Sequence, residues 1–353
     1  MSKIKDFVIT FKNYIIAAVC IILALILTLV SVSMENNLSA QTIADRWDDE
    51  TQYTEVSVFF SREANFNKNS LAGVRNTVRQ KVDESVALED VNGRYFIDTY
   101  STQATMEVYN KGKKVEARAF GVGGDFFLFH PIELVDGNYF DELTDPNEDG
   151  IILDENLAWQ LFGATKVTGM SVTLGDRTYP VRGVVKQEDG VFSEAVNETV
   201  ATIYMQYSAL EREMGTETQL NIDSYEALII DPVKNFALNA VTEGVSTTVG
   251  VDEKNFHIVE NSKRFSVGYK LKHLKTLFLD SMNLKGIVLP YWENKARGVE
   301  QVTLLLFVLT VLLLIYPVVY LGSKLIKLLI NLWGRFVTPL LNRGKDKIAS
   351  IFS

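Results

Sequence analysis

Two long runs without a charged residue constrain this 353-residue chain more than any other feature. Tyr14 to Met34 is 21 residues long, and Gln301 to Ser323 is 23 residues long. With a rise of about 1.5 Å per residue, each run would span as a helix roughly the 30 Å hydrocarbon core of a bilayer. Because a backbone in lipid must satisfy its own hydrogen bonds, both runs are predicted to be transmembrane helices.

The first run has an alternative interpretation, which is a cleaved signal peptide. Its apolar stretch is longer than the apolar region of about 7–15 residues typical of such peptides, and Leu38-Ser39-Ala40 is a poor cleavage site. We therefore predict a retained membrane anchor. In the second run, Pro317 predicts a kink of the kind that neighbouring helices tolerate within a membrane.

The distribution of charge predicts the orientation in the membrane. Residues 1–34 and 301–353 together carry nine basic and two acidic residues, a net charge of +7. Because the net charge of the whole chain is −9, residues 35–300 carry a net charge of −16. Since basic flanks stay in the cytoplasm, both termini are predicted to be cytoplasmic and residues 35–300 extracytoplasmic. The acidic outer segment argues against a nucleic-acid partner. With Cys20 as the single cysteine there is no disulfide framework, which favours the bacterial cytoplasmic membrane.

The outer segment is predicted to be a mixed α/β domain. Residues 54–60 are rich in β-branched and aromatic side chains, as strands are, and residues 69–86 repeat apolar residues at helical spacing. Further strands are predicted at 94–99, 104–109, 114–120, 199–207, 225–230 and 256–260, and further helices at 208–214 and 233–245. These elements form two βα-rich parts, at roughly 50–120 and 199–262, around an inserted β-rich part at roughly 121–198.

The inserted part carries a specific series of residues. Gly137 and Phe140 come first, and they are followed by a predicted strand at 151–153. A helix with Leu157, Ala158, Leu161 and Phe162 on one face ends at Gly163, and a hairpin turn at Gly175-Asp176 leads to Gly183-Val184-Val185. This series resembles the MacB-like periplasmic core domain of the MacB/FtsX-type (type VII) ABC transporter permeases. The flanking elements and the preceding span follow the same order.

The resemblance implies a fold class and a function. The fold would be a membrane protein in which two transmembrane helices flank an extracytoplasmic α/β (α+β) MacB-core-like domain. The relatives have four spans and some carry a nucleotide-binding domain, whereas this sequence shows two spans and no G-x-x-x-x-G-K-[ST] phosphate loop. We therefore expect a reduced, permease-like, non-ATPase subunit of an ABC transporter.

Several partners follow from that expectation. They are a separate ABC ATPase subunit, another permease subunit or further copies of this chain, and membrane lipid. The substrate class implied by the resemblance is a peptide, a lipid or a lipoprotein. A second hypothesis is a membrane-anchored extracytoplasmic binding, scaffold or sensor protein that uses the same outer fold.

Catalytic chemistry is not predicted. His130, His257 and His273 are scattered without the spacing of metal ligands, and no nucleophile-elbow motif occurs. The residues that carry the resemblance are of structural types. We expect no catalytic residue, no cofactor and no metal ligand.

The basic tail at 324–353 supplies the first candidate contact residues. Its segment from Lys324 to Asn342 is apolar but interrupted by charge, and it is too short to span a bilayer. We predict an amphipathic helix in the cytoplasmic interface, with Lys324, Lys327, Trp333 and Arg335 meeting the membrane. The resemblance adds an alternative, in which these residues dock an ATPase. Residues 1–13 read as a similar amphipathic lead-in.

A basic stripe on the acidic outer segment supplies the second set. Lys270, Lys272 and Lys275 alternate with apolar residues between 264 and 279. One interpretation is a stalk helix at roughly 264–282 that lies near anionic headgroups and transmits motion. The other is a helix packed on the domain with its lysines in solvent.

Overall fold

The computed structural model describes residues 2–47, 52–85, 95–140, 149–187, 200–215, 220–252, 254–272, 274 and 286–333. The chain divides into two compact units. One unit is Asn36–Gln301, and the other combines Met1–Glu35 with Val302–Ser353.

Both predicted spans lie within long helices, α1 (Ser2–Asn36) and α10 (Tyr291–Leu332). By length and composition, the segment Phe11–Asn36 and helix α10 are each able to cross a membrane. The rings of Tyr14 on α1 and Tyr320 on α10 meet edge to face at 5.3 Å between centroids. From Phe11 on in α1, and along the apolar run of α10, most large apolar side chains are exposed, which is the arrangement expected of a lipid-facing surface.

Helix α10 extends beyond its predicted end. We predicted a span that ends at Ser323 and an amphipathic interfacial helix from Lys324 onward, and α10 continues without a break from the apolar run to Leu332. The reason is local: residues 324–330 are Lys, Leu and Ile, which are compatible with a helix, so nothing interrupts the hydrogen-bond ladder. Pro317 lies inside the helix.

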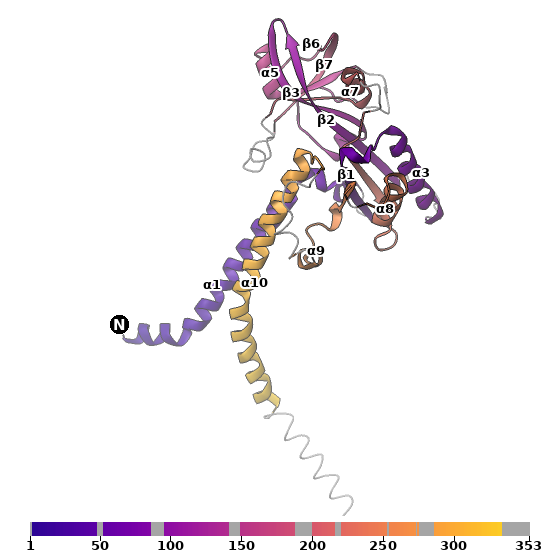
Figure 1. Ribbon diagram of the computed structural model, residues 1–353. Helices are drawn as coiled ribbons and strands as arrows, with labels where there is room; N and C mark the ends of the chain where they lie inside the picture. The colour runs from indigo at the N-terminus through magenta and orange to yellow at the C-terminus, as the bar shows by residue number, and fades with distance from the viewer. Residues whose placement is uncertain are drawn as a thin grey trace, which may run out of the picture. The chain divides into compact units, whose positions relative to one another are not determined.

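Ten strands form one sheet in the described part of the outer unit (Figure 1). Their order is β10-β1-β9-β2-β3-β8-β5-β7-β4, and β6 pairs with β2 and β7. The pairs β3–β8 and β5–β7 are parallel and the others are antiparallel. The strands are β1 (Tyr53–Phe60), β2 (Phe96–Asn110), β3 (Lys113–Gly124), β4 (Leu134–Gly137), β5 (Ile151–Asp154), β6 (Ser171–Leu174), β7 (Arg177–Val185), β8 (Thr202–Gln206), β9 (Ser224–Ile230) and β10 (Phe256–Glu260).

Strand β2 corrects one prediction. We predicted two strands, at 94–99 and 104–109, separated by a polar turn, but β2 is continuous over 15 residues. The polar side chains in the middle of β2 make hydrogen bonds to other residues of the protein. Ser101 Oγ lies 2.6 Å from Ser224 Oγ, and Thr102 Oγ1 donates to Asp223 Oδ2 at 3.1 Å. These bonds satisfy polar groups that the sequence alone assigns to a solvated turn.

Two helices cover one face of the first half of the sheet. α3 (Lys68–Ser85) and α8 (Phe236–Val249) lie side by side against β1 and β9 (Figure 1). Their apolar side chains form one cluster with those of the strands. Gly244 permits this close packing, because a Cβ there would lie 3.3 Å from Val74 Cγ1.

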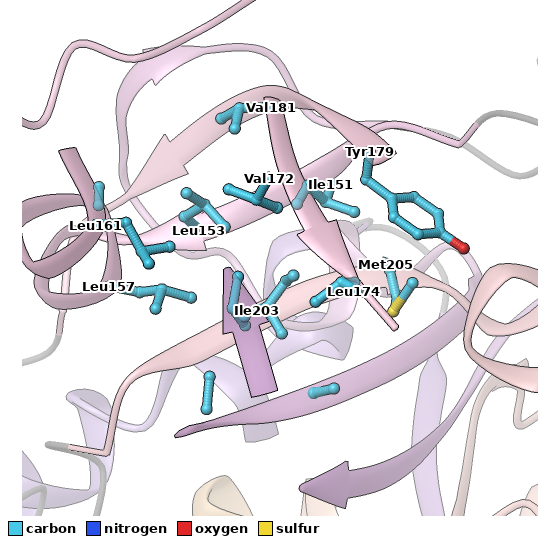
Figure 2. Close-up of a cluster of buried hydrophobic side chains, with 14 of the residues drawn as sticks. Ile151, Leu153, Leu157, Leu161, Val172, Leu174, Tyr179, Val181, Ile203 and Met205 are labelled. Atoms are coloured by element: carbon cyan, nitrogen blue, oxygen red, sulfur yellow. The ribbon is translucent and has the colours of Figure 1, made fainter. Parts of the chain in front are cut away.

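The second half of the sheet has its own apolar core. α5 (Glu155–Phe162) directs Leu157 and Leu161 toward Leu153 and Ile203 on the strands (Figure 2). α7 (Tyr207–Met214) contributes Ala209 and Leu210 to the same cluster. The predicted hairpin at Gly175-Asp176 joins β6 to β7, as the sequence indicates.

The glycines of the recognised series occupy strained or crowded positions. Gly137 has φ +77° and pairs directly with Gly183 across β4 and β7. A Cβ on Gly137 would lie 2.2 Å from the carbonyl oxygen of Arg182. Gly163 ends α5 in the left-handed conformation, while Phe140 and Leu161 are buried and Phe162 is half-buried.

Candidate functional site: a buried polar junction

The face of the sheet opposite α3 and α8 carries buried charges. Along β1, Glu55 and Ser57 alternate with the core residues Val56 and Val58, and along β9 Glu226 lies between Tyr225 and Ala227. Such alternation normally gives a solvated polar face. Here the exposed fraction of Glu55 is 0% and that of Glu226 is 1%. Something therefore covers this face and bonds to it.

The covering segments follow α1 in the chain or precede the apolar run of α10. They are η1 (Ser39–Gln41), α2 (Ile43–Trp47) and the first turns of α10, and all of them belong to the outer unit. The backbone N–H of Ile43 donates to Glu55 Oε2 at 3.3 Å, and Trp292 Nε1 donates to Glu226 Oε1 at 2.9 Å. Gln41 Nε2 donates to the carbonyl of Trp292 at 3.4 Å.

A buried arginine holds the next turns of α10. Arg264 Nη1 and Nη2 donate to the two carboxylate oxygens of Glu293 at 2.7 and 2.9 Å, and Arg264 Nε donates to Glu300 at 2.9 Å. Arg297 Nε donates to Glu293 at 2.8 Å. A two-point contact of this kind fixes orientation as well as distance. Burial lowers the pKa of Arg264, but Glu293 and Glu300 raise it above its ordinary value, so Arg264 stays charged.

The residues that bond the covering segments to Glu55 and Glu226, together with those around Arg264, are called the polar junction. It comprises Gln41, Ile43, Glu55, His130, Glu226, Asn261, Arg264, Trp292, Glu293, Arg297 and Glu300.

His130 sits between aromatic rings within the junction. It follows α4 (Phe126–Phe129), and its ring centroid lies 4.6 Å from that of Phe126 and 4.3 Å from that of Trp292. His130 Nε2 lies 3.2 Å from Glu226 Oε1. A cavity of about 20 Å³ borders His130 and Trp292, together with Gln41 and Lys295. That volume has room for about one water molecule.

Glu55 is held by donors from two further segments. Asn261 of η3 (Asn261–Lys263) donates from Nδ2 to Glu55 Oε1 at 2.8 Å, in addition to the Ile43 N–H. Burial and then the charge of Glu226 raise the pKa of Glu55 from 4.5 to about 8, against the opposing effects of Asn261, Ile43 and Arg46. Glu55 is therefore mostly protonated at neutral pH.

The geometry of the junction is suited to holding segments together. Among the described residues, no group of three or more His, Cys, Asp and Glu side chains is arranged to bind a metal ion. The contacts hold three pieces of chain on the sheet or on one another, namely the segment after α1, η3 with the adjoining Arg264, and the start of α10. The junction therefore fixes the first turns of α10 within the outer unit.

The predicted tail contacts lie along α10 and beyond it. Lys324 and Lys327 are exposed, and the ammonium of Lys324 lies 5.7 Å from the centroid of the Tyr320 ring. Trp333 is exposed at the end of the described helix. Arg335 lies outside the described residues. Their role as membrane or ATPase contacts stays a prediction.

The predicted stalk differs from expectation where it is described. The helix there is α9 (Val267–Lys272), which starts three residues after the expected start at 264. Lys270 is buried, with 6% exposed, although both interpretations placed it in solvent or at headgroups. Lys272 is exposed, and Lys275 lies outside the described residues. The side chain of Arg264 is instead drawn into the polar junction.

Sequence reasoning missed the residues of the junction. His130 read as an isolated histidine, and Arg264 as part of a basic stripe. A signal was present in the strands, because Glu55 and Glu226 interrupt otherwise strand-like segments. A second signal was the series Glu293, Arg297 and Glu300, which places alternating charges on one side of a helix immediately before an uncharged run.

The family of the chain follows from a match to a known domain. A family model described as the MacB-like periplasmic core domain matches residues 15–248. The chain belongs to this family. With its two apolar helices, it is a membrane protein with an extracytoplasmic MacB-like domain.

Individual relatives resemble shorter parts of the chain. The macrolide export ATP-binding/permease protein MacB of Neisseria gonorrhoeae is 27% identical over 107 residues, which are 30% of this chain and 16% of that protein. The same protein from Neisseria meningitidis serogroup A gives the same values. The match thus spans about a sixth of the length of these curated relatives.

Solved structures with similarity to the chain include two outer domains. The periplasmic region of MacB from Actinobacillus actinomycetemcomitans gives a TM-score of 0.43 at 17% identity, covering 64% of this chain and 93% of that one. The extracellular domain of the ABC-type transporter YknZ from Gram-positive bacteria gives a TM-score of 0.41 at 16% identity, covering 58% and 100%.

Proposed function

We propose that this chain is a permease-like, non-ATPase subunit of an ABC transporter complex. Its outer domain would handle substrate or partner proteins, and a separate ATPase subunit would supply the energy. Membership of the MacB-like family supports this proposal. The name of the Neisseria relatives, which joins an ATP-binding function to a permease, supports the pairing with an ATPase.

One observation carries the proposal, which is the continuity of α10. Its first turns are fixed to the sheet by Trp292 and to Arg264 by Glu293, and the same helix continues as an apolar segment to Leu332. A rotation or shift of the apolar turns between the junction and Pro317 would be passed to the junction, because hydrogen-bonded turns of one helix move together. The outer domain would thereby respond to events in the membrane.

The proposed topology places both termini in the cytoplasm. The basic ends of the chain and the acidic outer segment support this orientation. Lys324 and Lys327 would then lie at the cytoplasmic end of α10, where they would contact an ATPase or lipid headgroups. A further permease subunit, or further copies of this chain, would complete the membrane part, and the substrate would be a peptide, a lipid or a lipoprotein.

Purification of the tagged full chain from its native membranes, after crosslinking, tests the proposal. We expect mass spectrometry to recover an ABC ATPase and a further permease subunit or a multimer of this chain. The double variant Lys324→Glu/Lys327→Glu should reduce ATPase recovery, whereas Lys272→Glu on α9 is the matched control and should not. Recovery of outer-domain partners without any ATPase would overturn the proposal and support a membrane-anchored scaffold.

A further inference from the structure

The polar junction contains two carboxyl groups that share one buried face. Ser57 on β1 is paired with Glu226 on β9, and Glu55 lies two residues before Ser57 on the same face. Side chains in such a diagonal relation on adjacent strands are within about 7–8 Å of one another. Among the ion pairs of the described residues, neither Glu55 nor Glu226 has a lysine or arginine partner. Two buried carboxylates without such partners are costly to ionise together.

Each carboxyl holds a different segment on the sheet. Glu226 accepts the Trp292 N–H from α10 and lies next to His130. Glu55 accepts the Ile43 N–H from α2 and the Asn261 amide from η3. The protonation of this pair therefore acts on both segments that neighbour the apolar helices in the chain.

We propose that Glu55, Glu226 and His130 form a proton-binding site that controls how tightly the first turn of α10 is held on the sheet. With a proton on Glu55, the pair carries a single negative charge and Trp292 stays bonded to Glu226. Loss of that proton places a second buried negative charge on the same face. The resulting repulsion between Glu55 and Glu226 loosens the contact of Trp292 with Glu226, whereas the bonds that Glu55 accepts from Ile43 and Asn261 favour its charged form.

The other charged groups near Glu55 either affect its pKa weakly or are engaged by partners of their own. Glu226 on β9 raises the pKa of Glu55, and Arg46 on α2 lowers it more weakly than Asn261 and Ile43 do. On η3, the ammonium of Lys263 is engaged by Glu260 at 2.5 Å and Asp231 at 3.5 Å. On α10, Glu293 is engaged by Arg264 and Arg297. Lys295 lines the small cavity beside His130.

The position of the cavity gives the proton a route. The cavity has room for about one water molecule and borders His130, whose Nδ1 and Nε2 are both buried without a hydrogen-bond partner among the described residues. His130 Nε2 lies 3.2 Å from Glu226 Oε1 without making a hydrogen bond, so a rotation of the ring toward Glu226 would let the imidazole carry a proton between the cavity and the buried face. The pKa of Glu55, raised to about 8, places the change between neutral and mildly alkaline pH.

The fluorescence of Trp292 reports the change directly. The other tryptophans are replaced in the full chain by Trp47→Phe, Trp159→Phe and Trp333→Phe, and the protein is kept in detergent or nanodiscs. We expect the Trp292 emission to shift to longer wavelength as the pH rises from 6 to 9.5, with a midpoint near 8. Glu55→Gln should abolish the transition, and Glu226→Gln should move it to lower pH by removing the like charge.

A buried carboxyl elsewhere provides the matched control. Asp154 lies on β5, and burial raises its pKa to about 7. Asp154→Asn should leave the Trp292 transition unchanged. A transition that persists in Glu55→Gln, or the absence of any transition in a parent chain that remains folded by circular dichroism, would overturn the proposal.

Hydrogen exchange gives an independent measurement without substitutions in the site. Peptides covering 291–301 should lose protection between pH 7 and 9 beyond the known chemical acceleration, while peptides of α3 should not. Equal behaviour of the two sets of peptides would contradict the proposal. Because this measurement needs no transporter partner, its failure is distinguishable from failure of the proposed function.

Discussion

Trp292 on α10 donates a hydrogen bond of 2.9 Å to Glu226 on β9, and both side chains are buried. Strand β9 lies between β1 and β2 within the sheet, so this bond fixes the start of a membrane-directed helix to the interior of the outer domain. The neighbouring residue Glu293 adds the two-point contact with Arg264. Two adjacent residues thus hold α10 by two independent groups of contacts.

Removal of the Trp292 N–H should destabilise the outer domain. Trp292→Phe keeps an aromatic ring but leaves the buried Glu226 without its N–H donor, which costs about 1–3 kcal/mol. For a domain of this size, each kcal/mol lowers the melting temperature by roughly 2–4 °C. Thermal unfolding of the full chain in detergent measures the loss.

A second tryptophan serves as the control for that measurement. Trp159 on α5 is 62% exposed, so Trp159→Phe should change the melting temperature little. Equal losses in the two variants would show that the bond from Trp292 to Glu226 does not stabilise the domain.

Breaking the buried arginine contact should have a larger effect. Glu293→Gln leaves the charge of Arg264 with reduced compensation in a buried site, and removal of one partner from such a pair costs about 3–5 kcal/mol. The exposed pair of Lys81 and Glu243, at 2.8 Å, is the matched comparison. Glu243→Gln should cost less than about 1 kcal/mol. Similar unfolding temperatures for both variants would contradict a stabilising role of the Arg264 cluster.

The fold was largely predictable where local pattern and packing agree. The apolar runs at 14–34 and 301–323 predicted helices, and the series around Gly137 and Gly163 predicted the family, because these signals depend on neighbouring residues. The prediction of two strands in place of β2 was wrong, because the polar side chains in the middle of β2 bond to Ser224 and Asp223. These partners are more than 120 residues away in the chain. Sequence pattern alone does not reveal such long-range partners.

The candidate site was not predictable for the same physical reason. Glu55 and Glu226 have the alternation of a solvated strand face, and whether that face is covered depends on where η1, α2 and α10 pack. Arg264 likewise meets Glu293 only through tertiary structure. Residues that are buried only because a segment far away in the chain packs over them look like ordinary surface residues in a single sequence.

The pairing of Gly137 with Gly183 allows a test of whether the glycines that resemble the family pattern are needed for stability. Gly137→Ala adds a methyl group 2.2 Å from the Arg182 carbonyl at a φ of +77°, so β4 must separate from β7. Gly163→Ala isolates the backbone cost, because Gly163 has φ +72° and no atom within 4 Å of an added Cβ. We expect roughly 1–2 kcal/mol for Gly163→Ala and a clearly larger loss for Gly137→Ala. Unfolding of both variants in detergent, side by side with the parent, decides whether crowding at β4 matters.

The dependence of stability on pH should identify Glu55. Its pKa is raised from 4.5 to about 8 by burial and by Glu226, so its contribution to stability is complete below about pH 4.5 and is lost as the pH rises through about 8. Glu55→Gln keeps an oxygen that accepts the Asn261 amide but cannot ionise. The melting temperature of this variant should therefore fall less between pH 5 and pH 8.5 than that of the parent, whereas Glu243→Gln should follow the parent. A decline in Glu55→Gln as steep as in the parent would assign the pH dependence to another group.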